Sequence, residues 1–118
     1  KQFARAAEVD PSNVQPLYRL AVLHEETGQV EESELAVAKA LAIDPTHAGT
    51  QLIAARNALR AGDTRRANSY LAQLQKQGPD QFYTRELEAQ IALAAGNAEE
   101  ASAQFAELYK ERKSSILV

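Results

Sequence analysis

Thr27-Gly28-Gln29 is the stretch that decides the fold of this chain, because the same kind of turn recurs at Ala61-Gly62-Asp63 and at Ala95-Gly96-Asn97. The three glycines lie 34 residues apart. Three prolines keep the same interval, namely Pro11, Pro45 and Pro79. Glycine can adopt the left-handed conformation that ends a helix, and proline cannot continue a helix. Two independent kinds of helix breaker with one period predict an array of repeated helix pairs.

Between these breakers the apolar residues follow helical spacing, and no segment alternates apolar and polar residues as a strand would. The spacing predicts helices over approximately residues 14–27, 30–43, 47–61, 64–77, 80–95 and 98–112. Residues 1–9 have the pattern of the end of an earlier helix, and residues 114–118 that of the first turn of a seventh one. No linker or low-complexity segment interrupts the series, so we expect one continuous array.

Composition excludes several classes of function. The 118 residues carry 13 basic and 16 acidic side chains, a net charge of −3, which gives no electrostatic case for binding nucleic acid or an anionic membrane. The absence of cysteine excludes disulfides, thiolate metal sites and cysteine nucleophiles. No apolar run reaches the roughly 18–20 residues that span a bilayer, so we expect no membrane insertion by this segment. The chain lacks methionine and begins within a helical pattern, which suggests a fragment of a longer protein.

The period of 34 residues and the positions of the glycines and prolines resemble the tetratricopeptide repeat, a helix-turn-helix unit of 34 residues. With the prolines at position thirty-two, the glycines fall at the expected position fifteen, and position eight holds the expected small residue: Ala21, Ala55 and Ala89. Small side chains there let the two helices of a pair approach closely. The resemblance implies an all-α fold, a right-handed α-solenoid of antiparallel helix pairs. It divides the chain into residues 1–13, the second half of a preceding repeat, then repeats at 14–47, 48–81 and 82–113, and the start of another at 114–118.

Three residues of the third repeat depart from this pattern, and one of them is Ala92, which replaces the tyrosine usual at position eleven. Arg85 replaces the aromatic residue often found at position four, and Glu88 stands where the family usually has leucine. We therefore expect the weakest packing in this unit.

The alanine- and glutamine-rich composition of stretches such as residues 71–77 and 91–96 is similar to that of bacterial repeat proteins. It is similar more narrowly to the tetratricopeptide-repeat lipoproteins linked to PEP-CTERM sorting and exopolysaccharide systems. That narrower resemblance implies a periplasmic or outer-membrane-attached protein that helps to assemble an envelope, secretion or polysaccharide system; without it, a cytoplasmic location is expected.

No catalytic, metal or cofactor site is predicted. The two histidines, His24 and His47, have no converging set of further ligands in the sequence pattern, and His47 is expected at the entry of a helix. The glutamates fall on helix ends and solvated faces, where charge runs usually lie. No nucleophile elbow and no glycine-rich phosphate loop are present. The sequence therefore argues against enzyme activity.

Binding is the function that the resemblance implies, because the first helices of stacked units line a concave face. The family's groove positions can be transferred to this sequence repeat by repeat. They are Gln15, Tyr18, Val22 and Glu25 in the first repeat, Gly49, Leu52, Arg56 and Leu59 in the second repeat, and Tyr83, Glu86, Gln90 and Leu93 in the third repeat. Arg60 extends this face because it lies one helical turn after Arg56.

Two interpretations of the arginines follow. In one, Arg56 and Arg60 hold an acidic group of a partner while Tyr18 and Tyr83 hold its apolar side chains. In the other, the arginines are ordinary solvated residues that pair with nearby glutamates. The sequence leaves both open.

The chain is accordingly predicted to be a non-catalytic scaffold for a protein or peptide partner. The alternatives are a structural spacer within a longer array, or a regulatory domain of an enzyme or transcription factor. Both ends of the array should expose apolar side chains, from Phe3 and Val9 at one end and from Leu108 and residues 116–118 at the other, so we expect self-association.

Overall fold

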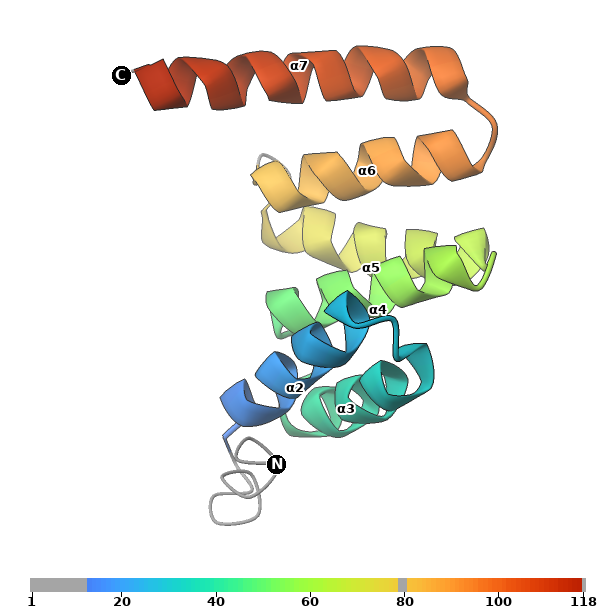
Figure 1. Ribbon diagram of the computed structural model, residues 1–118, viewed down its shortest axis with the longest axis vertical. Coiled ribbons are helices and arrows are strands. Elements are labelled where there is room, and N and C mark those ends of the chain that lie inside the picture. The colour runs from blue at the N-terminus through green and yellow to red at the C-terminus, as the bar shows by residue number, and fades with distance from the viewer. Residues whose placement is uncertain (1–12, 79–80, 118) are drawn as a thin grey trace. The chain divides into compact units, whose positions relative to one another are not determined.

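The computed structural model describes residues 13–78 and 81–117, and its regular secondary structure is entirely helical (Figure 1). The helices are α2 (Gln15–Glu26), α3 (Val30–Ile43), α4 (Ala48–Arg60), α5 (Thr64–Gln77), α6 (Phe82–Ala94) and α7 (Ala98–Leu117). The all-α fold predicted from the sequence is confirmed for this part of the chain. The predicted half-hairpin at residues 1–9, with Pro11, lies outside the described residues, and so does Pro79.

The predicted break after residue 112 is wrong, because α7 continues without interruption to Leu117. Each of the other helices ends close to a glycine or a proline. The segment around residues 111–114, Glu-Arg-Lys-Ser, contains neither residue, so nothing in the local backbone stops the helix there. Residues 114–117 therefore extend α7 and do not open a seventh helix.

The three repeated glycines end their helices in the same way. Gly28, Gly62 and Gly96 have φ values of +78°, +79° and +89°, the left-handed conformation expected of them. After α2, the N–H of Gln29 donates to the carbonyl of His24 at 2.8 Å, and the N–H of Gly28 donates to that of Glu25 at 3.2 Å. The same two bonds recur around Gly62 and Gly96. This is the Schellman arrangement, which satisfies carbonyls left unpaired at a helix end.

Pro45 separates α3 from α4 in a turn held by side chains. The carboxylate of Asp44 accepts the N–H of Thr46 at 3.2 Å. The amide of Gln51, a side chain that is 1% exposed, donates to the carbonyl of Pro45 at 3.0 Å. A buried glutamine thus supplies the hydrogen bond that this turn needs in place of a backbone partner.

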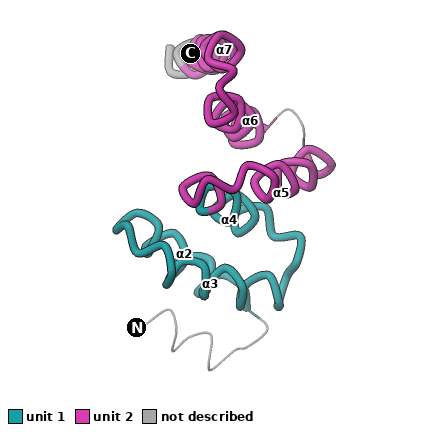
Figure 2. Tube along the Cα trace, turned by 90° about the vertical axis from the view of Figure 1, so that its right-hand side faces the viewer, with its two compact units in different colours: residues 1–57 teal, residues 58–118 magenta. Residues whose placement is uncertain are grey.

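The chain forms two compact units, residues 1–57 and residues 58–118, and the division falls within α4 (Figure 2). In the first unit α2 packs against α3 as an antiparallel pair, with Ala21, Val37 and Ala40 almost fully buried. In the second unit α6 packs against both α5 and α7. Leu74, Leu87 and Ala89 are fully buried there. Small and large apolar side chains together fill each core, as close helix packing requires.

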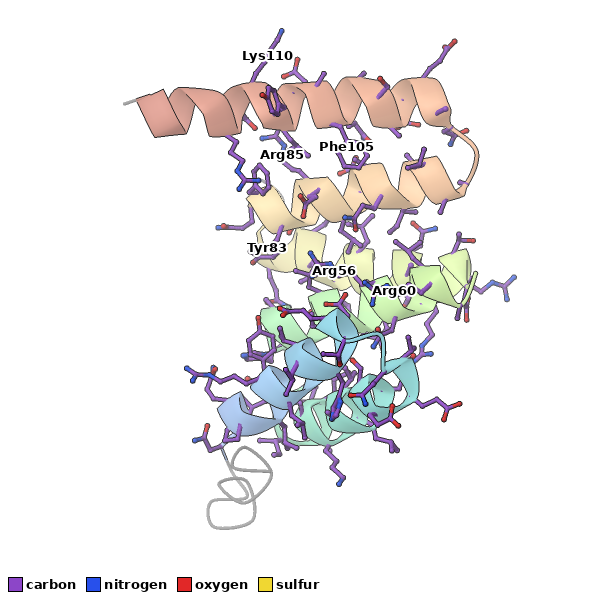
Figure 3. The ribbon with its side chains drawn as sticks, in the orientation of Figure 1. Arg56, Arg60, Tyr83, Arg85, Phe105 and Lys110 are labelled. Carbon is purple, nitrogen blue, oxygen red and sulfur yellow. The ribbon has the colours of Figure 1, made fainter. Side chains whose placement is uncertain are left out.

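Leu108 does not belong to an exposed end of the array, contrary to the sequence-based expectation. Its side chain is 3% exposed and lies in the core of the second unit. Phe105, one turn earlier, is on the side of α7 that faces α6, whereas Lys110 points away from α6 (Figure 3). The remaining residues of the expected apolar ends, Phe3 and Val9 and the side chains of residues 116–118, lie outside the described part.

Candidate partner-binding surface

Helices α2 and α4 lie side by side in the first unit and run in the same direction. Tyr18 of α2 meets Gly49 at the start of α4, and Glu25 near the end of α2 meets Arg56 near the end of α4. Both pairs are separated by 31 residues in the sequence. A constant offset at both ends means that the two helices are parallel and in register. In the division of the chain that the resemblance implies, these are the first helices of the first and second repeats.

The ring of Tyr18 is held where α2 meets the entry of α4. A Cβ atom on Gly49 would lie 2.7 Å from Cε1 of Tyr18, so a side chain at this position would require the ring to shift. The ring also packs edge-on against His47, with centroids 5.0 Å apart and planes at 63°. The side-chain amide of Gln15 lies 3.4 Å from Nε2 of the same histidine. Tyr18 therefore has a defined position.

His47 has the helix-entry position predicted for it. The backbone N–H of Thr50 donates to Nδ1 of His47 at 3.2 Å. The hydroxyl of Thr50 is 2.8 Å from the same nitrogen. The imidazole thus satisfies one of the backbone N–H groups that the first turn of α4 leaves unpaired, as an N-cap side chain does.

The predicted groove residues of the first unit share one strip along these two helices. We call this strip the first-helix surface and define it by its residues: Gln15, Tyr18, Val22, Glu25, Gly49, Leu52 and Arg56. Gln15 is exposed, and Tyr18, Val22, Leu52 and Arg56 are partly exposed. The spacing of one turn between successive members keeps them on one face of each helix. The strip therefore offers one aromatic and two aliphatic side chains to solvent, flanked by polar groups.

Arg56 forms an ion pair within this surface. Its Nη1 lies 3.5 Å from Oε1 of Glu25, and the two side chains are 33% and 5% exposed. For Arg56 the structure agrees with the interpretation in which an arginine pairs with a glutamate of the same chain. Arg60 is exposed, on the part of α4 that belongs to the second unit (Figure 3).

A buried polar network, which the sequence pattern did not predict, joins three helices of the first unit. The hydroxyl of Ser33 on α3 donates to the carbonyl of Ala21 on α2 at 3.0 Å, and the amide of Asn57 on α4 donates to that hydroxyl at 3.0 Å. Ser33 and Asn57 are both fully buried. The available signal was Asn57 itself, a polar residue among Ala54, Ala55 and Ala58 on α4.

In the second unit the predicted groove residues Tyr83, Glu86 and Gln90 share one face of α6 by their spacing, and all three are partly exposed. Leu93, one turn further, is 56% exposed. These side chains belong to a different compact unit from the first-helix surface, so a groove that joins the two sets remains a prediction.

Two of the departures from the repeat pattern, Glu88 and Arg85, have polar partners. Glu88 accepts hydrogen bonds from Gln75 of α5 at 3.5 Å and from Gln104 of α7 at 3.2 Å. Arg85 lies between α6 and α7 and forms an ion pair with Glu111 (Figure 3). At these positions side-chain bonds tie α6 to its neighbours. The weaker packing expected of this unit stays a prediction. No sequence pattern pointed to these pairs, because their members are 13 to 26 residues apart.

A small cavity of about 120 Å³ accompanies this polar cluster of the second unit. It is lined by Arg85, Glu88, Gln104, Glu107 and Leu108. The side-chain oxygen of Gln104 is buried without a hydrogen-bond partner. A cavity of this size has room for water, which can donate to such an oxygen.

Within residues 13–78 and 81–117, no group of three or more histidine, cysteine or acidic side chains is placed to hold a metal ion. In the same part of the chain, no helix has both the length and the apolar character needed to cross a membrane.

Three alanines that occupy the same predicted position in successive repeats are fully buried. Ala21, Ala55 and Ala89, at the predicted helix crossings, are 0% exposed. A comparison with protein families then identifies the pattern itself: the family model described as tetratricopeptide repeat matches residues 1–48 and 54–116. No curated protein matches the chain. The narrower resemblance to PEP-CTERM lipoproteins receives no support from these comparisons.

Proposed function

Because the chain belongs to the tetratricopeptide repeat family, we propose that it is a non-catalytic interaction module that binds a segment of another protein on its first-helix surface. Repeats of this family generally mediate protein–protein interaction and carry no catalytic machinery of their own. Stacked helix pairs suit this task, since their first helices form an extended surface on rigid elements.

The parallel register of α2 and α4 is the observation that carries the proposal. It places Tyr18, Val22 and Leu52 on one strip, each partly exposed, with the tyrosine ring held by Gly49 and His47. A fixed aromatic side chain loses little conformational entropy on binding, and aromatic anchors contribute a large part of the energy at interfaces. The strip therefore provides a preorganised apolar anchor with polar groups beside it.

Selection from a random peptide display library tests this function. We expect the protein to enrich specific peptides, and Tyr18→Ala to weaken an enriched peptide at least tenfold. Leu35→Ala is the matched control, because Leu35 is 65% exposed on α3, outside the surface, and loses a similar apolar side chain. It should bind as the unmodified protein does.

The site is then mapped by backbone amide chemical shifts during titration with the enriched peptide. Shifts concentrated in α2 and α4 support the proposal. Failure to enrich any peptide, or equal effects of Tyr18→Ala and Leu35→Ala, would contradict it and favour the alternative of a structural spacer within a longer array.

Finer roles extend the same proposal. We include Tyr83, Glu86 and Gln90 as further contacts for a longer partner segment, because they occupy the corresponding family positions. We include Arg60 because it lies one helical turn after Arg56. Self-association through the ends of the array, and a place in a bacterial envelope or polysaccharide system, rest on the sequence pattern alone. Sedimentation of the purified chain and cell fractionation of the full-length protein would test these two.

A further inference from the structure

His47 accepts a backbone hydrogen bond at the start of α4, and this bond defines its protonation state. The N–H of Thr50 donates to Nδ1 of His47 at 3.2 Å, and the hydroxyl of Thr50 lies 2.8 Å from the same nitrogen. A backbone N–H can only donate, so Nδ1 is an acceptor and carries no proton. The neutral ring then has its proton on Nε2, which lies 3.4 Å from the side-chain amide of Gln15. The observed arrangement therefore requires the uncharged imidazole.

Protonation of His47 would remove this arrangement. An imidazolium has a hydrogen on both ring nitrogens and accepts no hydrogen bond. The hydroxyl of Thr50 could accept from Nδ1, but the backbone N–H of Thr50, fixed in the first turn of α4, would lose its acceptor. Thr50 is fully buried, so this loss is costly, and the positive end of the α4 dipole also disfavours a cation here. The charged ring is therefore expected to leave its position.

The groups that contact the ring of His47 are uncharged. On α2 they are the titratable phenol of Tyr18, which packs edge-on, and the amide of Gln15. On α4 the contact is Thr50. At the end of α3 the nearest charged residue in the sequence is Asp44, whose carboxylate accepts two hydrogen bonds within its own turn. Among the described residues, the polar contacts of the ring thus offer no negative charge to hold an imidazolium.

The position of Tyr18 depends on this imidazole. The tyrosine ring lies against the backbone of α4 at Gly49, and His47 packs against it with centroids 5.0 Å apart. If the imidazole moved away, the tyrosine ring would lose its aromatic neighbour and gain rotational freedom. A side chain that must be ordered on binding contributes less to affinity than one already held in place. Movement of His47 should therefore weaken the first-helix surface at its aromatic anchor.

We propose that the neutral form of His47 holds Tyr18 in its binding position, so that the first-helix surface binds its partner near neutral pH and releases it on acidification. Histidine is the side chain that generally gains its charge between about pH 8 and pH 5. His47 acts on the partner through Tyr18, so it is a positioning residue. This inference rests on the proposed function and adds its regulation.

The affinity of one enriched peptide at about pH 7.5 and about pH 5 tests the inference. The peptide is acetylated, amidated and free of histidine and acidic residues, so that it does not titrate itself. The unmodified protein should bind it at least fivefold more weakly at the lower pH. His47→Asn keeps an oxygen that can accept the N–H of Thr50 but cannot gain a proton, so the pH dependence should disappear. His24→Asn is the matched control, because it removes the other histidine and should leave the pH dependence unchanged.

A second measurement needs neither a variant nor a peptide. In a pH titration of the unmodified protein followed by NMR, the ring resonances of Tyr18 should shift with the same midpoint as the imidazole resonances of His47. Equal affinity at both pH values would overturn the inference. So would a pH dependence that survives in His47→Asn, or tyrosine resonances that do not follow the histidine. These results would leave the proposed function intact, whereas absence of any enriched peptide would contradict that function itself.

Discussion

At the scale of single residues, position in the repeat did not determine what a side chain does. Glu25 and Arg56 are both groove positions of the family, yet here they bind each other. Arg85 and Glu88, which depart from the repeat pattern, bind side chains of neighbouring helices. In each case the partner lies on another helix, so the role depends on packing. The role of a charged residue at a repeat position therefore depends on its partner as well as on its position.

The unequal burial of Glu25 and Arg56 predicts unequal effects on stability. Arg56→Ala leaves a nearly buried carboxylate without this cation, and we expect it to lower the free energy of unfolding by roughly 1–3 kcal/mol. Glu25→Gln leaves a partly exposed guanidinium that water can reach, so its effect should be smaller. Urea denaturation followed by circular dichroism gives both values. An equal or larger loss for Glu25→Gln would contradict the argument.

At the scale of helices and turns, the repeated glycine ends each first helix in the same way. The left-handed φ of Gly96 is +89°, and a Cβ atom added there would meet nothing within 4 Å. The effect of a substitution at Gly96 on stability should therefore come from the backbone conformation and not from a steric clash. Elsewhere a side chain caps the next helix, as Asp63 does by accepting the N–H of Arg66 at 3.0 Å.

Gly96→Ala should consequently lower the free energy of unfolding by about 1–2 kcal/mol, the cost of a left-handed conformation for an L-residue. Gly96→Asn is the control, since asparagine tolerates this conformation better, and it should cost less. Thermal unfolding followed by circular dichroism compares the two. Equal losses would indicate a contact of the added side chain and would contradict a purely conformational effect.

At the scale of the whole molecule, the described chain comprises two compact units with the division inside α4. Arg56 forms an ion pair with Glu25 within the first unit, and the turn at Gly96 forms its hydrogen bonds within the second. Repeat proteins gain stability from such local interactions and from contacts between neighbouring repeats.

Substitutions in different units should therefore be additive. For the double variant Arg56→Ala, Gly96→Ala we expect a loss of unfolding free energy within about 0.5 kcal/mol of the sum of the two single losses. Urea denaturation of the four proteins measures the coupling. A larger coupling would mean that the helix which spans both units, α4, transmits the change from one to the other.

The sequence by itself determined the period, the all-α class, the helix-ending glycines and most helix limits. These follow from backbone preferences and from the spacing of apolar residues, which are properties of neighbouring positions in the chain. It misjudged the end of α7 and the exposure of Leu108, where no local breaker marked the outcome. It placed Tyr18, Val22, Leu52 and Arg56 on a candidate strip only through the resemblance to a family.

Only the tertiary structure decided which side chains in that strip meet. The pairing of Glu25 with Arg56 and the network of Ser33 with Asn57 join residues 31 and 24 positions apart. Such pairs depend on the register of packed helices and on the burial of each group, and neither quantity is a property of a single segment. For that reason the sequence predicted a surface for binding, while the packing of α2 against α4 decided which of its side chains contact each other.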